Sequence, residues 1–142
     1  MEFGPTKRLS LFIDSVLNNV SKLYCGDEYI KDTSHFLQKL NAVEEKLCRP
    51  GVQLYTLDVK ALYPSINPTY VPEAVQAALD TVTVLSEDRK KAIIELVVFS
   101  ISNAVVHYRD RWYRMLEGVP TGGSDSVCLA NIYMKWVLIK FF

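Results

Sequence analysis

Proline and glycine interrupt the apolar patterns of this sequence, so the chain cannot form one long regular element. Arg49-Pro50-Gly51 forms one interruption, Pro64 and Pro68 bracket a second, and the glycine-rich residues 118–124 form a third. Proline cannot continue a helical hydrogen-bond ladder, and glycine turns the backbone. The segments between these interruptions are short, and the period of the apolar residues in each one predicts its secondary structure.

Most of these segments have the apolar spacing of helices. The spacing predicts helices over residues 9–23, from about 32–34 to 47, and over 69–85, 86–101 and 125–141. Their expected N-caps are Thr6, Thr69, Ser86 and Asp125, with Pro72 in the first turn of the third helix. In the second helix the spacing predicts a buried stripe of Phe36, Leu37, Leu40, Val43 and Leu47.

Two regions are rich in residues that favour strands. Residues 53–59 form a short β-rich segment, and Val105–Tyr108 with Trp112–Met115 flank Arg109-Asp110-Arg111 as a β-hairpin. The expected order is therefore α-α-β-α-α-ββ-α. This order is an α+β pattern, and we expect one compact unit.

Composition narrows the class of protein. Sixteen Lys and Arg balance sixteen Asp and Glu, so net charge alone does not attract nucleic acid. This balance does not exclude a local basic groove. Hydrophobic residues make up 49% of the chain, which is too apolar for a disordered protein. The three cysteines have no metal-binding or disulfide spacing, which favours an intracellular protein. The most apolar run, residues 93–106, contains Glu95 and other polar residues, so we expect no membrane partner.

Asp58 is the carboxylate that the sequence singles out, because it ends the apolar segment 53–59. A carboxylate in that place must be solvated, paired or bound to a metal, since burying it alone is costly. A strand-end aspartate that caps the next turn would satisfy the same pattern.

Two longer motifs point further. Asp58-Val59-Lys60-Ala61-Leu62-Tyr63-Pro64-Ser65-Ile66 resembles motif A of reverse transcriptases. Gly118-Val119-Pro120-Thr121-Gly122-Gly123-Ser124, with Ala130-Asn131-Ile132-Tyr133-Met134, resembles their motif B. Residues 9–14, 29–33 and 35–40 are similar to segments before motif A in Penelope-like retroelements.

This resemblance to Penelope-like reverse transcriptases implies a domain plan. Residues 8–142 correspond to a partial fingers–palm domain, with motif A at 54–66, motif B at 118–134 and an incomplete palm sheet. Residues 1–7 are expected to be a cloning or fingers remnant. Nothing resembling motif C or the thumb follows motif B, so we expect no polymerase activity from this chain alone.

The resemblance also implies an activity and a set of roles. The activity is RNA-directed DNA synthesis, with dNTP, an RNA template and a DNA primer as partners. Asp58 is the implied catalytic and metal-binding residue for Mg²⁺ or Mn²⁺, which this chain would not hold tightly. The implied nucleotide-binding residues are Val59, Lys60, Ala61, Leu62, Tyr63, Thr121 and Gly122. The implied template and primer contacts are Gly123, Asn131, Arg109, Arg111 and Arg114.

Each role has a simpler alternative. Tyr63 is the implied steric gate under the sugar, but an ordinary tyrosine of the core would give the same sequence pattern. The arginines could equally belong to a solvated surface without a nucleic-acid partner. A retroelement-derived nucleic-acid-binding or interaction module without catalysis is the alternative function, and a helical interaction domain is a third. We also expect self-association through the bare apolar edge 54–58, and a nuclear location for the full-length element.

Overall fold

The computed structural model describes residues 6–141, which divide into two compact units rather than the expected one. The first unit runs to Cys25 and resumes at Lys60, and the second comprises Gly26–Val59. The helices of the first unit are α1 (Lys7–Cys25), α4 (Leu62–Ser65), α5 (Val71–Asp80), α6 (Glu87–Ser102) and α7 (Ser126–Phe141). Strands β1 (Val105–Tyr108) and β2 (Arg111–Arg114) form its antiparallel hairpin. The structure is therefore α+β and mostly helical.

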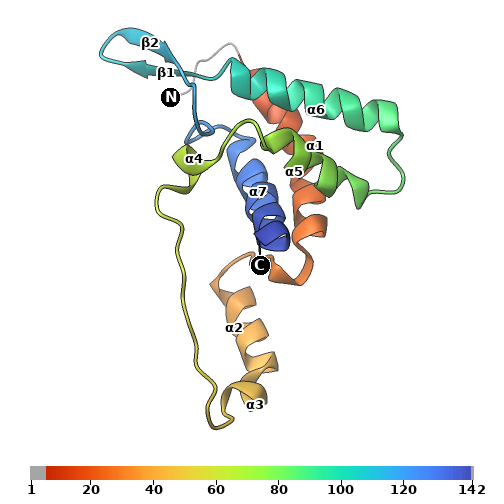
Figure 1. Cartoon of the computed structure of the whole chain (residues 1–142), viewed down its shortest axis with the longest axis vertical. Coiled ribbons are helices and arrows are strands. Elements are labelled where there is room, and N and C mark those ends of the chain that lie inside the picture. Colours follow the sequence, from red (N-terminus) through yellow and green to blue (C-terminus); the bar gives the residue numbers. More distant parts are fainter. Residues whose placement is uncertain (1–5, 142) are drawn as a thin grey trace. The chain divides into compact units, whose positions relative to one another are not determined.

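Four helices of the first unit enclose its hydrophobic core. Helix α7 packs against α1 and α5, and α6 packs against α1 and α5 (Figure 1). Ile13, Leu17, Leu79, Val97 and Ile132 are almost fully buried there. Burial of these apolar side chains is the main force that holds the helices together.

The second unit contains short helices and an extended segment. It comprises a 3₁₀ turn (Gly26–Glu28, η1), α2 (Thr33–Ala42) and α3 (Glu44–Leu47), followed by irregular backbone up to Val59. Asp32 caps α2, because its Oδ1 accepts a hydrogen bond from the His35 N–H at 2.8 Å. Neither α2 nor α3 contains a buried residue, so the predicted buried stripe from Phe36 to Leu47 is wrong. A single short helix pair offers no second layer against which that stripe could be buried.

The predicted strand at residues 53–59 is also wrong. The backbone there is extended (Figure 1) but forms no ladder, and every residue of the segment is exposed. A strand needs a hydrogen-bonding neighbour, and within residues 6–141 the only pairing is between β1 and β2. Local β propensity alone did not supply that neighbour.

Other helix and strand boundaries differ from the predicted ones by smaller amounts. Helix α5 begins after Tyr70 and ends at Asp80, whereas the prediction placed its cap at Thr69 and its end near residue 85. The Thr69 N–H instead donates to Asn67 Oδ1, which forms a turn before the helix. Strand β2 begins at Arg111, one residue earlier than predicted, which leaves a two-residue hairpin loop. Ser86 occupies the predicted N-cap position of α6, but its side chain forms no capping hydrogen bond, whereas the first-turn Pro72 is confirmed. The expected remnant at 1–7 lies mostly outside the described residues, and Lys7 begins α1.

Candidate functional site

The two motifs meet through backbone hydrogen bonds in the first unit. The Val119 N–H donates to the Tyr63 carbonyl oxygen at 3.0 Å, and the Gly118 N–H donates to the Ile66 carbonyl oxygen at 3.1 Å. Residues from the end of the motif A segment thus pair with the start of the motif B loop. We call this contact, Tyr63–Ile66 with Gly118–Val119, the motif junction.

Gly118 is required at the motif junction for two reasons. Its φ of +74° lies in the region that favours glycine. A Cβ at this position would also lie 2.7 Å from both the Pro64 Cα and the Tyr63 carbonyl oxygen. Because both of those atoms belong to the backbone, a larger residue would force the two segments apart.

The turn that leads into the junction has an unusual backbone. Ala61 adopts a left-handed conformation with φ 54° and ψ 53°, which costs a non-glycine residue about 1–2 kcal/mol. The Ala61 carbonyl oxygen accepts from the Ser65 N–H at 3.1 Å, and Ser65 Oγ donates to the Lys60 carbonyl oxygen at 3.4 Å. This turn places Leu62 and Tyr63 half-buried against the hydrophobic core. Packing against the core therefore explains why the Tyr63 side chain is partly buried.

Asp58 and Val59 belong to the second unit, where they lie in the exposed extended segment. Within residues 6–141, no three His, Cys, Asp or Glu side chains gather closely enough to hold a metal ion. Magnesium in a nucleotidyl-transfer site shares several carboxylate oxygens, and one carboxylate cannot bind two ions well. The described residues thus do not by themselves fit a two-metal centre.

A pocket of about 330 Å³ lies beside the motif B loop, in the first unit. Thr121 and Gly123, which carry implied nucleotide and template roles, line this pocket together with Pro120. Gly122 is exposed in the same loop. The remaining lining comes from the N-terminal part of α1, the end of α6 and the hairpin, and includes Lys7, His107 and Trp112.

Asp125 is a buried carboxylate at the edge of this pocket, with 4% of its surface exposed. Its Oδ1 accepts from Ser10 Oγ at 2.6 Å and its Oδ2 accepts from Ser100 Oγ at 3.2 Å. Asp125 directly precedes α7, as predicted, and its carbonyl oxygen accepts the Leu129 N–H at 3.0 Å, but its carboxylate bonds to the two serines instead of capping the helix. The sequence did not reveal the two serines as partners, although each is a polar residue within an apolar helix pattern.

Gly123 is tightly packed against the same aspartate. A Cβ here would lie 2.6 Å from Ser126 Oγ and 3.1 Å from Asp125 Oδ1. The absence of a side chain at Gly123 is therefore explained by the packing of the loop onto the first turn of α7. That explanation does not require a template strand.

The burial of Asp125 also affects a neighbouring thiol. Burial, followed by the negative charges of Asp14 and Asp125, raises the pKa of Cys128 to about 12. Cys128 Sγ donates to the Asp125 carbonyl oxygen at 3.0 Å. A thiol with so high a pKa stays protonated at neutral pH, which disfavours reaction as a nucleophile.

The remaining implied contacts lie in two places. Asn131 is half-buried in α7, and its carbonyl oxygen accepts from Cys25 Sγ at 3.7 Å. Arg109, Arg111 and Arg114 belong to the hairpin and its loop, and all three are exposed. Arg114 Nε donates to the Ser102 carbonyl oxygen at 2.8 Å, which ties the base of the hairpin to the end of α6.

Comparison with known proteins gave no match to any family model, to any curated protein or to any solved structure. The α+β fold is therefore assigned from the structure alone. In the described part of the chain, none of the helices has the length and apolar character needed to cross a membrane.

Proposed function

We propose that this chain is part of the fingers and palm of a reverse transcriptase from a Penelope-like retroelement. Its role in that protein is to help position a dNTP on a primer–template. The observation that carries the proposal is the motif junction, in which the Val119 N–H donates to the Tyr63 carbonyl oxygen at 3.0 Å. The proposal requires the two motifs to lie together, and here residues far apart in sequence are joined through their backbones.

The groups around the junction suit a phosphate-bearing ligand. Backbone N–H groups in the turn at Lys60–Tyr63 offer donors for a triphosphate, and the Lys60 side chain adds positive charge. Thr121 contributes a hydroxyl to the wall of the adjoining pocket. Tyr63 combines core packing with the steric-gate position that the resemblance implies.

Catalysis is proposed only for the longer protein. Asp58 is a single carboxylate, and the described residues do not form a two-metal centre, so no chemical step is assigned to this chain. In the longer protein, Asp58 would be one carboxylate among several that bind Mg²⁺.

Primer extension with Mg²⁺ and dNTPs tests the catalytic proposal. The chain, the whole reading frame to which it belongs, and that reading frame with Asp58→Ala are compared on an RNA template with a DNA primer. We expect extension by the unchanged reading frame alone. Full extension by the Asp58→Ala protein would refute the assigned role of Asp58, and an inert reading frame would refute catalysis.

A matched pair of glycine variants tests the motif junction in this chain. Gly118→Ala introduces both backbone strain and a clash with Tyr63 and Pro64, whereas Gly51→Ala, in the second unit, introduces backbone strain with nothing within 4 Å of the new Cβ. We expect Gly118→Ala to weaken dNTP binding, measured by isothermal titration calorimetry, far more than Gly51→Ala does. Equal effects would show that the junction does not support the nucleotide site.

The second candidate is a retroelement-derived module that binds nucleic acid without catalysis. The observation that favours it is the exposed hairpin, where three arginines lie among exposed aromatic residues. In the primer-extension experiment, this candidate predicts a whole reading frame that binds primer–template and extends nothing.

A further inference from the structure

The register of the hairpin separates its side chains into two faces. Val106 pairs with Tyr113 and Tyr108 pairs with Arg111, and directly opposed residues share a face. Those residues form what we call the outer face. Val105, Arg114, His107 and Trp112 form the inner face by the same rule.

The loop between the strands fixes this register. Arg109 and Asp110 both have positive φ, at 48° and 61°. Two such residues are typical of the two-residue turns whose twist matches that of paired strands. A one-residue slip would exchange the two faces, and this turn resists such a slip.

The inner face borders the pocket, although its His107, Trp112 and Arg114 are also exposed, Trp112 with 58% of its surface. Val105, His107 and Trp112 line the pocket, and the His107 and Trp112 rings lie 4.8 Å apart. Arg114 is held at the base through its bond to Ser102. Of the outer face, only Val106 also reaches the pocket.

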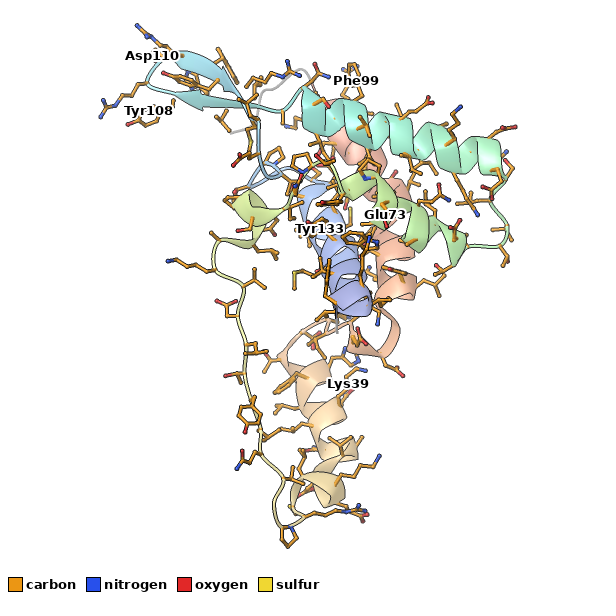
Figure 2. The ribbon with its side chains drawn as sticks, in the orientation of Figure 1. Lys39, Glu73, Phe99, Tyr108, Asp110 and Tyr133 are labelled. Atoms are coloured by element: carbon orange, nitrogen blue, oxygen red, sulfur yellow. The ribbon has the colours of Figure 1, made fainter. Side chains whose placement is uncertain are left out.

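The outer face presents aromatic rings and positive charge to solvent. Tyr108 is 58% exposed and Tyr113 is 47% exposed, and the Arg109 guanidinium lies 5.2 Å from the centre of the Tyr108 ring. Diagonal neighbours across paired strands lie roughly 7–8 Å apart, so both tyrosines can contact one ligand. Figure 2 shows Tyr108 and Asp110 at the far end of the hairpin, away from the helices.

The local charge differs from that of the whole chain. The hairpin and its loop carry three arginines and one aspartate, whereas the complete chain has a formal net charge of zero. Positive charge beside exposed aromatic rings is the combination that binds single nucleic-acid strands, because arginine neutralises phosphate and any base can stack on an aromatic ring.

We propose that the outer face of the hairpin binds a single nucleic-acid strand, with bases stacked on Tyr108 and Tyr113 and phosphates contacted by Arg109 and Arg111. This proposal rests on the nucleic-acid partner of the proposed function and gives that partner a surface. The two tyrosines provide the stacking, and Arg114 anchors the hairpin to the end of α6.

The test is fluorescence anisotropy of the full chain with a labelled oligouridylate of about 12 nucleotides, within the usual site size for such strands. The Tyr108→Ala/Tyr113→Ala variant is expected to bind at least about tenfold more weakly, since it removes both rings on which bases stack. The Tyr108→Phe/Tyr113→Phe variant keeps both rings and is expected to retain its affinity. Arg111→Gln is expected to reduce the slope of log affinity against log salt concentration by the equivalent of about one phosphate contact.

Tyr55→Ala provides the matched control, because Tyr55 is a 79%-exposed tyrosine in the other unit. An equal loss of affinity in Tyr55→Ala, unchanged binding by the double alanine variant, or no binding by the unchanged chain would each overturn the proposal. Failure of primer extension together with tyrosine-dependent binding would refute catalysis and leave the hairpin surface intact. Circular dichroism of each variant verifies that the fold is retained.

Discussion

Ser10 Oγ donates a hydrogen bond of 2.6 Å to Asp125 Oδ1, across 115 positions of the sequence. The same hydroxyl oxygen accepts from the Asp125 backbone N–H at 3.2 Å, so the two residues are joined in both directions. Ser100 donates to the other carboxylate oxygen from α6. One buried aspartate thereby links α1, α6 and the start of α7 beside the motif B loop.

Loss of the Ser10 hydroxyl is expected to destabilise the fold. Ser10→Ala removes one hydrogen bond from a buried carboxylate, and such a loss typically costs about 1–3 kcal/mol in the free energy of unfolding. Ser15→Ala is the matched control on the same helix, because Ser15 is exposed and its hydroxyl donates to the nearby Phe12 carbonyl oxygen. Urea denaturation followed by circular dichroism measures both. Equal stability of the two variants would contradict a structural role for the Ser10–Asp125 pair.

Asp80 is expected to make stability depend on acid pH. The Lys90 hydrogen bond, followed by that of Gln76, lowers the pKa of Asp80 below its ordinary value of 3.8. Since the folded-state pKa is the lower one, this stabilisation is present above pH 3.8 and is lost as the pH falls through the folded-state pKa. The stability difference between the unchanged chain and Asp80→Asn should therefore be present at neutral pH and disappear in acid.

Thermal unfolding across a pH series measures this difference. Asp110→Asn, which removes an exposed carboxylate at the hairpin tip, provides the control. A gap between Asp80→Asn and the unchanged chain that persists undiminished in strong acid would refute the role of the Asp80–Lys90 pair.

The cysteines are expected to differ in reactivity. Cys48 is exposed, whereas Cys128 is buried with its pKa raised to about 12. At pH 8 a thiol-specific reagent should therefore modify Cys48 rapidly and Cys128 only after unfolding. Mass spectrometry of the native and urea-treated chain identifies the modified residues. Rapid modification of Cys128 in Cys48→Ser, without denaturant, would show that the packing around α7 is open.

Self-association through residues 54–58 remains a prediction, although its structural basis has changed. The segment is not a strand edge, but it exposes Leu54, Tyr55 and Leu57, the last with 96% of its surface exposed. Contiguous exposed apolar side chains favour association. Leu57→Lys is expected to reduce the apparent mass of the chain in light scattering. Leu116→Lys, at an 83%-exposed leucine elsewhere, is the control. A chain that stays monomeric at high concentration would contradict the prediction.

Ser21 offers a stabilising substitution. Its Oγ is buried and has no hydrogen-bond partner within the described residues. A buried hydroxyl without a partner costs free energy, and Ser21→Ala removes that cost while keeping the Cβ. We expect the midpoint of urea denaturation to stay the same or rise. A drop as large as that expected for Ser10→Ala would reveal a partner for the hydroxyl.

Helix positions were predictable where apolar periodicity coincided with a local start or stop signal. The starts of α6 after Ser86 and of α7 after Asp125, and the first-turn Pro72, are examples, because each depends on a few neighbouring residues. Residues 53–59 show the opposite case. Their β propensity predicted a strand, but a strand depends on a partner that propensity does not specify.

The features of the candidate site also divide into those set by local sequence and those set by tertiary packing. The sequence by itself determined which residues resemble motifs A and B, and it determined the helical and hairpin segments around them. Only the tertiary structure decided that Val119 bonds to Tyr63, that Asp125 is buried between two serines, and which hairpin face borders the pocket. Turns and helices are set by contacts between near neighbours. The motif junction and the burial of a carboxylate require segments distant in sequence to pack together, and a local pattern cannot encode that packing.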